Sequence, residues 1–116
     1  MAPEFWIQAG AVGMFLAVAL GAFAAHGLKA RLTPEMLTIF ETGVRYHVYH
    51  ALALLALGAA RGPEKAGWCF IAGIVVFSGS LYVLALTGEK RLGMVTPLGG
   101  LLFLAGWALF ALKPRG

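Results

Sequence analysis

Residues 5–25 read FWIQAGAVGMFLAVALGAFAA, and none of these side chains carries a charge. A helix needs about 20 mostly apolar residues to cross a bilayer, because the hydrocarbon layer is about 30 Å thick and each helical residue rises about 1.5 Å. Residues 67–87 form a second uncharged run of this length, and residues 43–60 and 94–112 are also predominantly apolar. The sequence therefore predicts four membrane spans at about these positions.

Composition and loop length define the predicted fold further. Hydrophobic residues make up 60% of the chain and charged residues 12%. In a soluble domain, roughly half of the residues are apolar and roughly a quarter are charged. The apolar runs lack the alternation of membrane strands, and four strands cannot close a barrel. Short connections make neighbouring helices antiparallel. We predict an all-α fold, an up-down transmembrane four-helix bundle that forms a single domain over residues 1–116.

The connections carry helix start signals. Thr33 and Pro34 are typical of an N-cap followed by a first helical residue, and Thr96 before Pro97 indicates the same arrangement for the last helix. Residues 34–45 mix apolar and charged side chains, which predicts a short amphipathic surface segment between helices 1 and 2, continuous or kinked with the second span. The first span lacks the basic segment of a secretory signal, so we expect it to be retained.

A stripe of small side chains runs along the first span at every fourth position. Its members are Ala9, Gly13, Ala17, Gly21 and Ala25. Small residues let another helix backbone approach closely in a membrane. The stripe therefore predicts helix packing, either against a neighbouring span of the same chain or between two copies in a homo-oligomer.

Alternating helix direction sorts the polar side chains to one end of the bundle. The predicted shallow pocket at that end comprises His26, Tyr46, His50, Ser78, Ser80, Tyr82 and Thr96. We expect His26 and His50 to approach each other across the first helix pair. The opposite end collects Trp6, Trp68 and Trp107, as in half of an aromatic belt.

Four motifs carry a resemblance to a known family. They are GAFAAHGLK at 21–29, YHVYHAL at 46–52, FSGSLY at 77–82 and TPLGG at 96–100. In this order they resemble the motifs of the YgdD/YwdK-type small multipass membrane proteins, and the resemblance covers essentially the whole chain. It implies a four-span protein, in bacteria usually of the cytoplasmic (inner) membrane, and it carries no settled biochemical activity with it.

The residues favour a non-enzymatic function. A histidine titrates near pH 6.5, so the predicted pocket suits a lipid headgroup or a small ligand of unknown identity, with a link to proton or solute movement as an option. Ser78 and Ser80 lack a carboxylate that would orient a histidine base. The alternative is a structural or assembly protein that acts through the small-residue stripe and oligomerisation.

No metal or other cofactor is predicted. A closed zinc site needs four ligands, and the single cysteine, Cys69, is expected at the end opposite the histidines; axial haem ligation by His26 and His50 stays open. The net charge of +4 is spread over loops on both faces, which argues against nucleic acid and for membrane lipids as partners. Because basic residues are nearly balanced between the two faces, the membrane orientation is left open.

Overall fold

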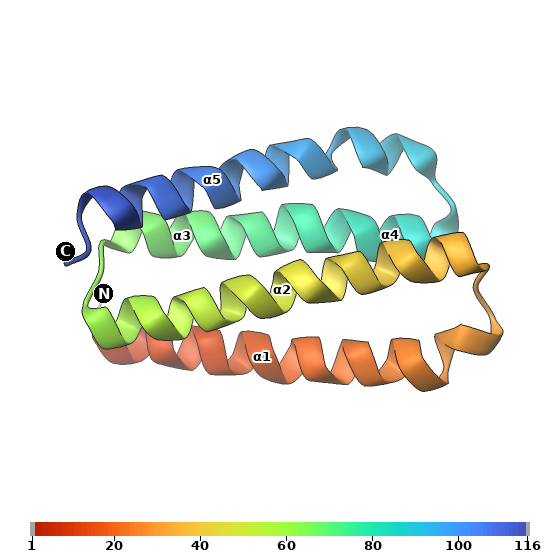
Figure 1. Cartoon of the computed structure of the whole chain (residues 1–116), viewed down its shortest axis with the longest axis horizontal. Helices are drawn as coiled ribbons and strands as arrows, with labels where there is room; N and C mark the ends of the chain where they lie inside the picture. Colours follow the sequence, from red (N-terminus) through yellow and green to blue (C-terminus); the bar gives the residue numbers. More distant parts are fainter. Residues whose placement is uncertain (1, 116) are drawn as a thin grey trace.

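The computed structural model describes residues 2–115, and these residues form helices and loops with no strand. The prediction of an all-helical fold is confirmed. Four rods lie side by side and alternate in direction, and both chain ends lie at the same end of the molecule (Figure 1). The rods are α1 (Pro3–His26), α2 (Pro34–Ala60), the run of α3 (Glu64–Gly73), η2 (Ile74–Ser78) and α4 (Gly79–Thr87), and α5 (Thr96–Leu112).

Two of the three connections contain short 3₁₀ turns, η1 (Leu28–Ala30) and η3 (Lys90–Met94). Three helical segments of residues 2–115 are long and apolar enough to cross a membrane: Pro3–Ala30, Glu64–Thr87 and Lys90–Leu112. α2 is not among them, because its first half carries charged residues and its middle carries histidines and tyrosines.

Residues 34–45 are continuous with the second predicted span, as one of the two alternatives required. They are the first part of the 27-residue helix α2, and Phe40 and Gly43 within them are buried. The helix begins as predicted, since the Thr33 side chain accepts a hydrogen bond from the Met36 N–H and Pro34 occupies the first turn. It ends at Arg61, whose left-handed backbone (φ 57°) stops the helix before Gly62.

The third rod is continuous from Glu64 to Thr87, but its middle, η2, is a π-helical segment. A π turn adds a residue to the local repeat and therefore rotates the faces before and after it relative to each other. Ser78 at the end of η2 is fully buried, and its hydroxyl donates to the carbonyl of Gly43 at 2.7 Å. This bond ties the π segment to α2.

The small-residue stripe packs inside the molecule. A Cβ placed on Gly10 would lie 2.7 Å from the Ala51 carbonyl oxygen, and one on Gly13 would lie 3.1 Å from the Ala51 Cβ. Ala17 is fully buried. Gly10 lies beside the predicted stripe and not in it, while Gly13 and Gly21 of the stripe face Ala51 and Val44 of α2. The intramolecular alternative therefore describes the middle of the stripe, whereas Ala25 is exposed and packing between two copies stays a prediction.

The expected belt of tryptophans is wrong for one of its three members. Trp6 is only 2% exposed and belongs to a core cluster with Leu54, Leu57 and Phe70. Trp107 reaches from α5 towards α2. Trp68 and Trp107 are both exposed, at 47% and 44%, and the Trp68 ring packs edge-on against Trp6 at 5.3 Å between centroids.

Candidate functional site

His50 lies in the middle of the bundle and links α2 to α5. Its Nδ1 lies 2.8 Å from the Tyr46 carbonyl oxygen, and its Nε2 lies 3.0 Å from the indole nitrogen of Trp107. A carbonyl only accepts and an indole N–H only donates, so Nδ1 carries the proton and Nε2 accepts. The ring also stacks on Phe103 at 3.5 Å between centroids. His50 is thus a neutral imidazole with both nitrogens committed.

An aromatic groove lies beside His50, with a volume of about 480 Å³. It is lined by Tyr46, Tyr49, His50, Phe77, Gly100, Phe103, Leu104 and Trp107. Tyr49 and Leu104 are exposed, so the groove opens on the side of the bundle. Within residues 2–115, the phenol oxygens of Tyr46 and Tyr49 make no hydrogen bond. The groove therefore presents two hydrogen-bonding groups on an otherwise aromatic and aliphatic wall.

A second polar pair, His47 and Tyr82, joins α2 to α4. The His47 Nδ1 lies 2.8 Å from the Tyr82 hydroxyl, and His47 also hydrogen-bonds the backbone of Gly13 in α1. Tyr82 packs on Phe40 with 4.8 Å between ring centroids. His47 thus connects three helices, and the sequence analysis did not single it out. The signal was present, since His47 lies four residues from both Gly43 and Ala51, which face the core.

The hydroxyl groups of the predicted pocket serve helix contacts. Ser80 lies 2.8 Å from the Phe77 carbonyl oxygen and 2.6 Å from the Thr96 hydroxyl. The Thr96 hydroxyl also lies 3.3 Å from the Leu92 carbonyl oxygen, so two hydroxyl protons serve these three contacts. The expected N-cap role of Thr96 is wrong, because α5 already begins at this residue and no side chain caps it within the described chain.

His26 does not approach His50. It is the last residue of α1 and is exposed, whereas His50 is next to Ala51, which contacts Gly13 in the middle of α1. Thirteen residues separate Gly13 from His26, or about 20 Å along a helix. The cause is the length of α2, whose first part, rather than its histidines, lies beside the end of α1.

The seven predicted pocket residues therefore separate into three groups. Tyr46 and His50 line the aromatic groove, while Tyr82, Ser78, Ser80 and Thr96 make contacts between or within helices. His26 stands apart at the end of α1. Among residues 2–115, no three His, Cys, Asp or Glu side chains are placed to hold a metal ion.

The sequence comparisons agree with this membrane-type helical fold. A family model described as "Protein of unknown function (DUF423)" matches residues 20–100. The chain belongs to the DUF423 family. It is 44% identical over 113 residues to the UPF0382 membrane protein YwdK of Bacillus subtilis, with 91% of this chain and 92% of that protein covered. A UPF0382 membrane protein of Staphylococcus haemolyticus is 42% identical over 115 residues, with 95% and 94% covered. No solved structure matches the chain.

The family assignment confirms the resemblance to YwdK-type proteins. Together with three helical segments long and apolar enough to span a membrane, it identifies this DUF423 member as a multipass integral membrane protein. The DUF423 match includes Tyr46, His47, His50 and Tyr82, whereas Trp107 lies outside it.

Proposed function

We propose that this protein is a four-span, non-enzymatic membrane protein that holds a membrane-soluble ligand in the aromatic groove. The ligand class is a flat or unsaturated hydrocarbon with a hydrogen-bonding oxygen. The observation that carries the proposal is the pair of unpartnered phenols, Tyr46 and Tyr49, on the groove wall.

α2 is the fourth span in this proposal. It lies between α1 and the third rod (Figure 1), and its buried histidines have their partners inside the molecule. Its charged residues Glu35, Glu41 and Arg45 are exposed and lie in its first half. Gly21 lies beside Val44, so Arg45 is little more than a turn from the end of the uncharged part of α1, where a long side chain can reach the headgroups.

The depth of the groove favours a lipid-soluble occupant. His50 is level with Gly13, near the middle of α1, so the groove lies far from both ends of the bundle. Water is absent from the middle of a bilayer, and a polar group without a partner there is costly. A ligand oxygen would supply the partner for Tyr46 or Tyr49, and the rings of Phe77 and Phe103 would pack against its flat frame. A charged lipid headgroup suits this depth less well.

The hydrogen bonds that the polar groups already make support a binding role rather than catalysis. Both His50 nitrogens are occupied, and the hydroxyls of Ser78 and Ser80 bond to helix carbonyls. A nucleophile beside a free base, as acyl transfer needs, does not occur among these groups.

Native mass spectrometry of protein extracted gently from membranes tests the proposal. The Tyr46→Phe/Tyr49→Phe double variant keeps both rings and removes both hydroxyls, so the co-purifying small ligand should fall at least tenfold in occupancy. Tyr82→Phe is the matched control, because it removes a phenol that already pairs with His47. Equal adducts in all three proteins would reject ligand binding. A dimer that only the double variant loses would support the assembly alternative instead.

A further inference from the structure

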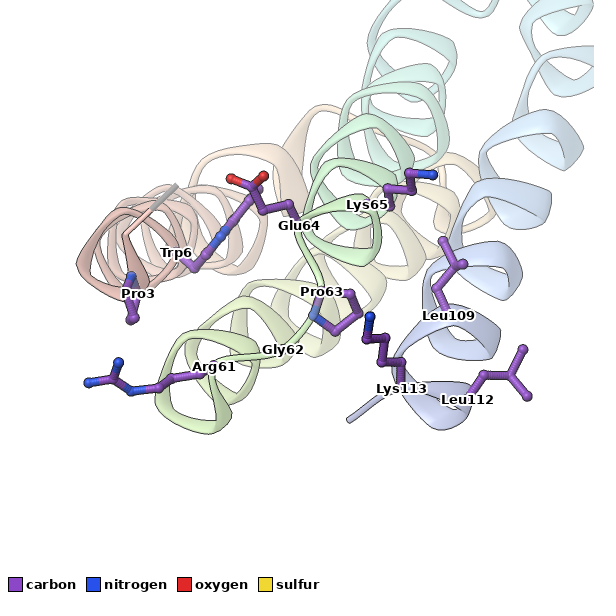
Figure 2. Close-up of a pocket in the computed structure, with 10 residues that line it drawn as sticks. All are labelled: Pro3, Trp6, Arg61, Gly62, Pro63, Glu64, Lys65, Leu109, Leu112 and Lys113. Carbon is purple, nitrogen blue, oxygen red and sulfur yellow. The ribbon is translucent and has the colours of Figure 1, made fainter. Parts of the chain in front are cut away.

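A separate cavity of about 670 Å³ lies at the end of the bundle that holds Pro3 and Lys113. We call it the end cavity; residues 61–65 between α2 and α3 form one wall, and Trp6, Leu109, Leu112 and Lys113 contribute to the others (Figure 2). Arg61 lies eleven residues after His50, a rise of about 16 Å along a helix. On α5, by contrast, Trp107 of the aromatic groove and Leu109 of the end cavity are only two residues apart. The two cavities share no lining residue.

The end cavity carries an excess of positive charge. Arg61, Lys65 and Lys113 line it from three different parts of the fold, against one carboxylate, Glu64, which has an interaction of its own. Figure 2 shows the Lys113 amine beside Pro63, whereas the ends of the Arg61 and Lys65 side chains point away from this pair. Long basic side chains at the end of a membrane bundle can place their charges at the level of lipid phosphates.

Trp6, which lines this cavity, carries a buried donor. Trp6 is 2% exposed, and its indole nitrogen is buried without a hydrogen-bond partner in the part of the chain that the structure describes. Figure 2 shows Trp6 between Pro3 and Glu64 at the cavity wall. An indole N–H can only donate, so the group that satisfies it has to be an acceptor.

The start of α3 adds to the preference for an anion. Pro63 is the N-cap residue, and no described side chain accepts a hydrogen bond at this cap. The first turn of a helix presents N–H groups without partners in the helix, and the helix dipole favours negative charge there. This end of α3 faces the same cavity as Trp6 and Lys113.

We propose that the end cavity binds a phosphate group through the Trp6 N–H, the start of α3 and the charge of Arg61, Lys65 and Lys113. The phosphate belongs either to an anionic phospholipid or to free inorganic phosphate, which share this chemistry. Leu109 and Leu112 add an apolar side to the cavity, which suits the glycerol and upper acyl chain of a lipid.

Titration of the purified full chain in a neutral detergent, followed by native mass spectrometry, tests the proposal. The probes are phosphatidylglycerol, phosphatidylcholine and inorganic phosphate. We expect phosphatidylglycerol to bind at least tenfold more tightly than phosphatidylcholine. Competition by millimolar inorganic phosphate would assign the site to the phosphate group alone, and lack of competition would assign it to the lipid; both results support phosphate recognition.

Three variants locate the site. Lys113→Gln and Trp6→Phe should each weaken phosphatidylglycerol binding about five- to tenfold. Lys90→Gln removes the same charge at the opposite end of the bundle and should change binding less than twofold. Lys113 is exposed near the end of the chain, so its substitution leaves the fold intact even where Trp6→Phe does not. Equal binding by Lys113→Gln and Lys90→Gln, or equal affinity for the two lipids, would overturn the proposal.

The Tyr46→Phe/Tyr49→Phe variant separates this proposal from the proposed function. It should keep the affinity for phosphatidylglycerol whatever it does to the ligand of the aromatic groove. A parallel loss of phosphatidylglycerol binding in that variant would count against an independent site at the end cavity.

Discussion

The contact between α1 and α2 and the contact between the third rod and α5 are built in different ways. In the first, small residues bring two backbones together, as at Gly10 beside Ala51. In the second, aromatic rings sit over glycines of the facing helix. These pairs are Phe103 on Gly73 and Phe70 on Gly106, and beside them Gly99 lies against the backbone of Phe77. The comparison shows that a membrane protein can pack with small-on-small and large-on-small contacts in one chain.

The difference also locates the candidate site. Close small residues leave little room, so the contact of α1 with α2 serves mainly to hold the helices together. In the contact between the third rod and α5, the aromatic rings extend past the glycines, and Phe77 and Phe103 also line the aromatic groove. His50 stacks on Phe103, so packing of α5 and positioning of the groove depend on the same side chain.

Gly99→Ala should have the largest effect on stability. Its Cβ would lie 2.4 Å from the Phe77 backbone nitrogen and 2.7 Å from the Phe77 Cα, and backbone cannot move aside as a side chain can. Overpacking usually costs about 1–3 kcal/mol, and a clash with backbone should exceed about 3 kcal/mol. Reversible unfolding in mixed micelles, followed by circular dichroism, measures this.

Gly79→Ala is the control for that experiment, because no atom lies within 4 Å of a Cβ at this position. It should be neutral, or more stable by about 0.5–1 kcal/mol from the higher helix propensity of alanine. Equal losses for both variants would mean that the contact of Gly99 with Phe77 does not set the effect.

His50→Leu should cost the next largest amount, about 2–3 kcal/mol, because it leaves the Trp107 N–H without its acceptor and removes the stack on Phe103. Trp107→Phe removes the other partner. Since the two residues form one hydrogen bond, the double variant should lose less than the sum of the single losses when unfolding free energies are compared. Strict additivity would show that the bond between α2 and α5 contributes nothing.

Features that depend on local sequence could be predicted. The length of the uncharged apolar stretches predicted α1 and the third rod, and Thr33 and Pro34 predicted the start of α2. Both signals depend only on residues that are neighbours in the sequence. The spacing of the small residues in the first span likewise indicated a packing face. The middle of that face is covered by α2 within the chain, as one of the two predicted alternatives required.

Features that depend on helix register could not be predicted. Starting the second span near residue 43, nine residues after the observed first residue of α2, places His50 beside His26 instead of level with Gly13. The π-helical segment adds a rotation that no heptad or 3.6-residue pattern anticipates. Pairs such as Gly99 with Phe77 join different helices, so their spacing in the sequence carries no information about contact.

Gly10→Ala probes the contact between α1 and α2 at its tightest point. The new Cβ would lie 2.7 Å from the Ala51 carbonyl oxygen and 2.9 Å from the Leu55 nitrogen, so we expect a loss of about 2 kcal/mol. Gly21→Ala, where the nearest atom is a Val44 methyl at 3.4 Å, should change stability by less than about 0.5 kcal/mol. Reversed sensitivities would show that α1 and α2 approach most closely at the other end.

Ser78→Ala should have the smallest effect and tests how the two halves of the bundle are joined. The Ser78 hydroxyl donates to the Gly43 carbonyl oxygen at 2.7 Å, across the boundary between α2 and η2. Hydrogen bonds between membrane helices contribute about 0.6 kcal/mol on average, so unfolding in micelles should show a loss of 1 kcal/mol or less. A loss comparable to that of Gly99→Ala would mean that hydrogen bonding, rather than the fit of rings against glycines, holds the third rod in place. A small loss of stability would show that packing against its neighbours holds the π-helical segment in place. The aromatic groove would then keep its shape without this hydrogen bond.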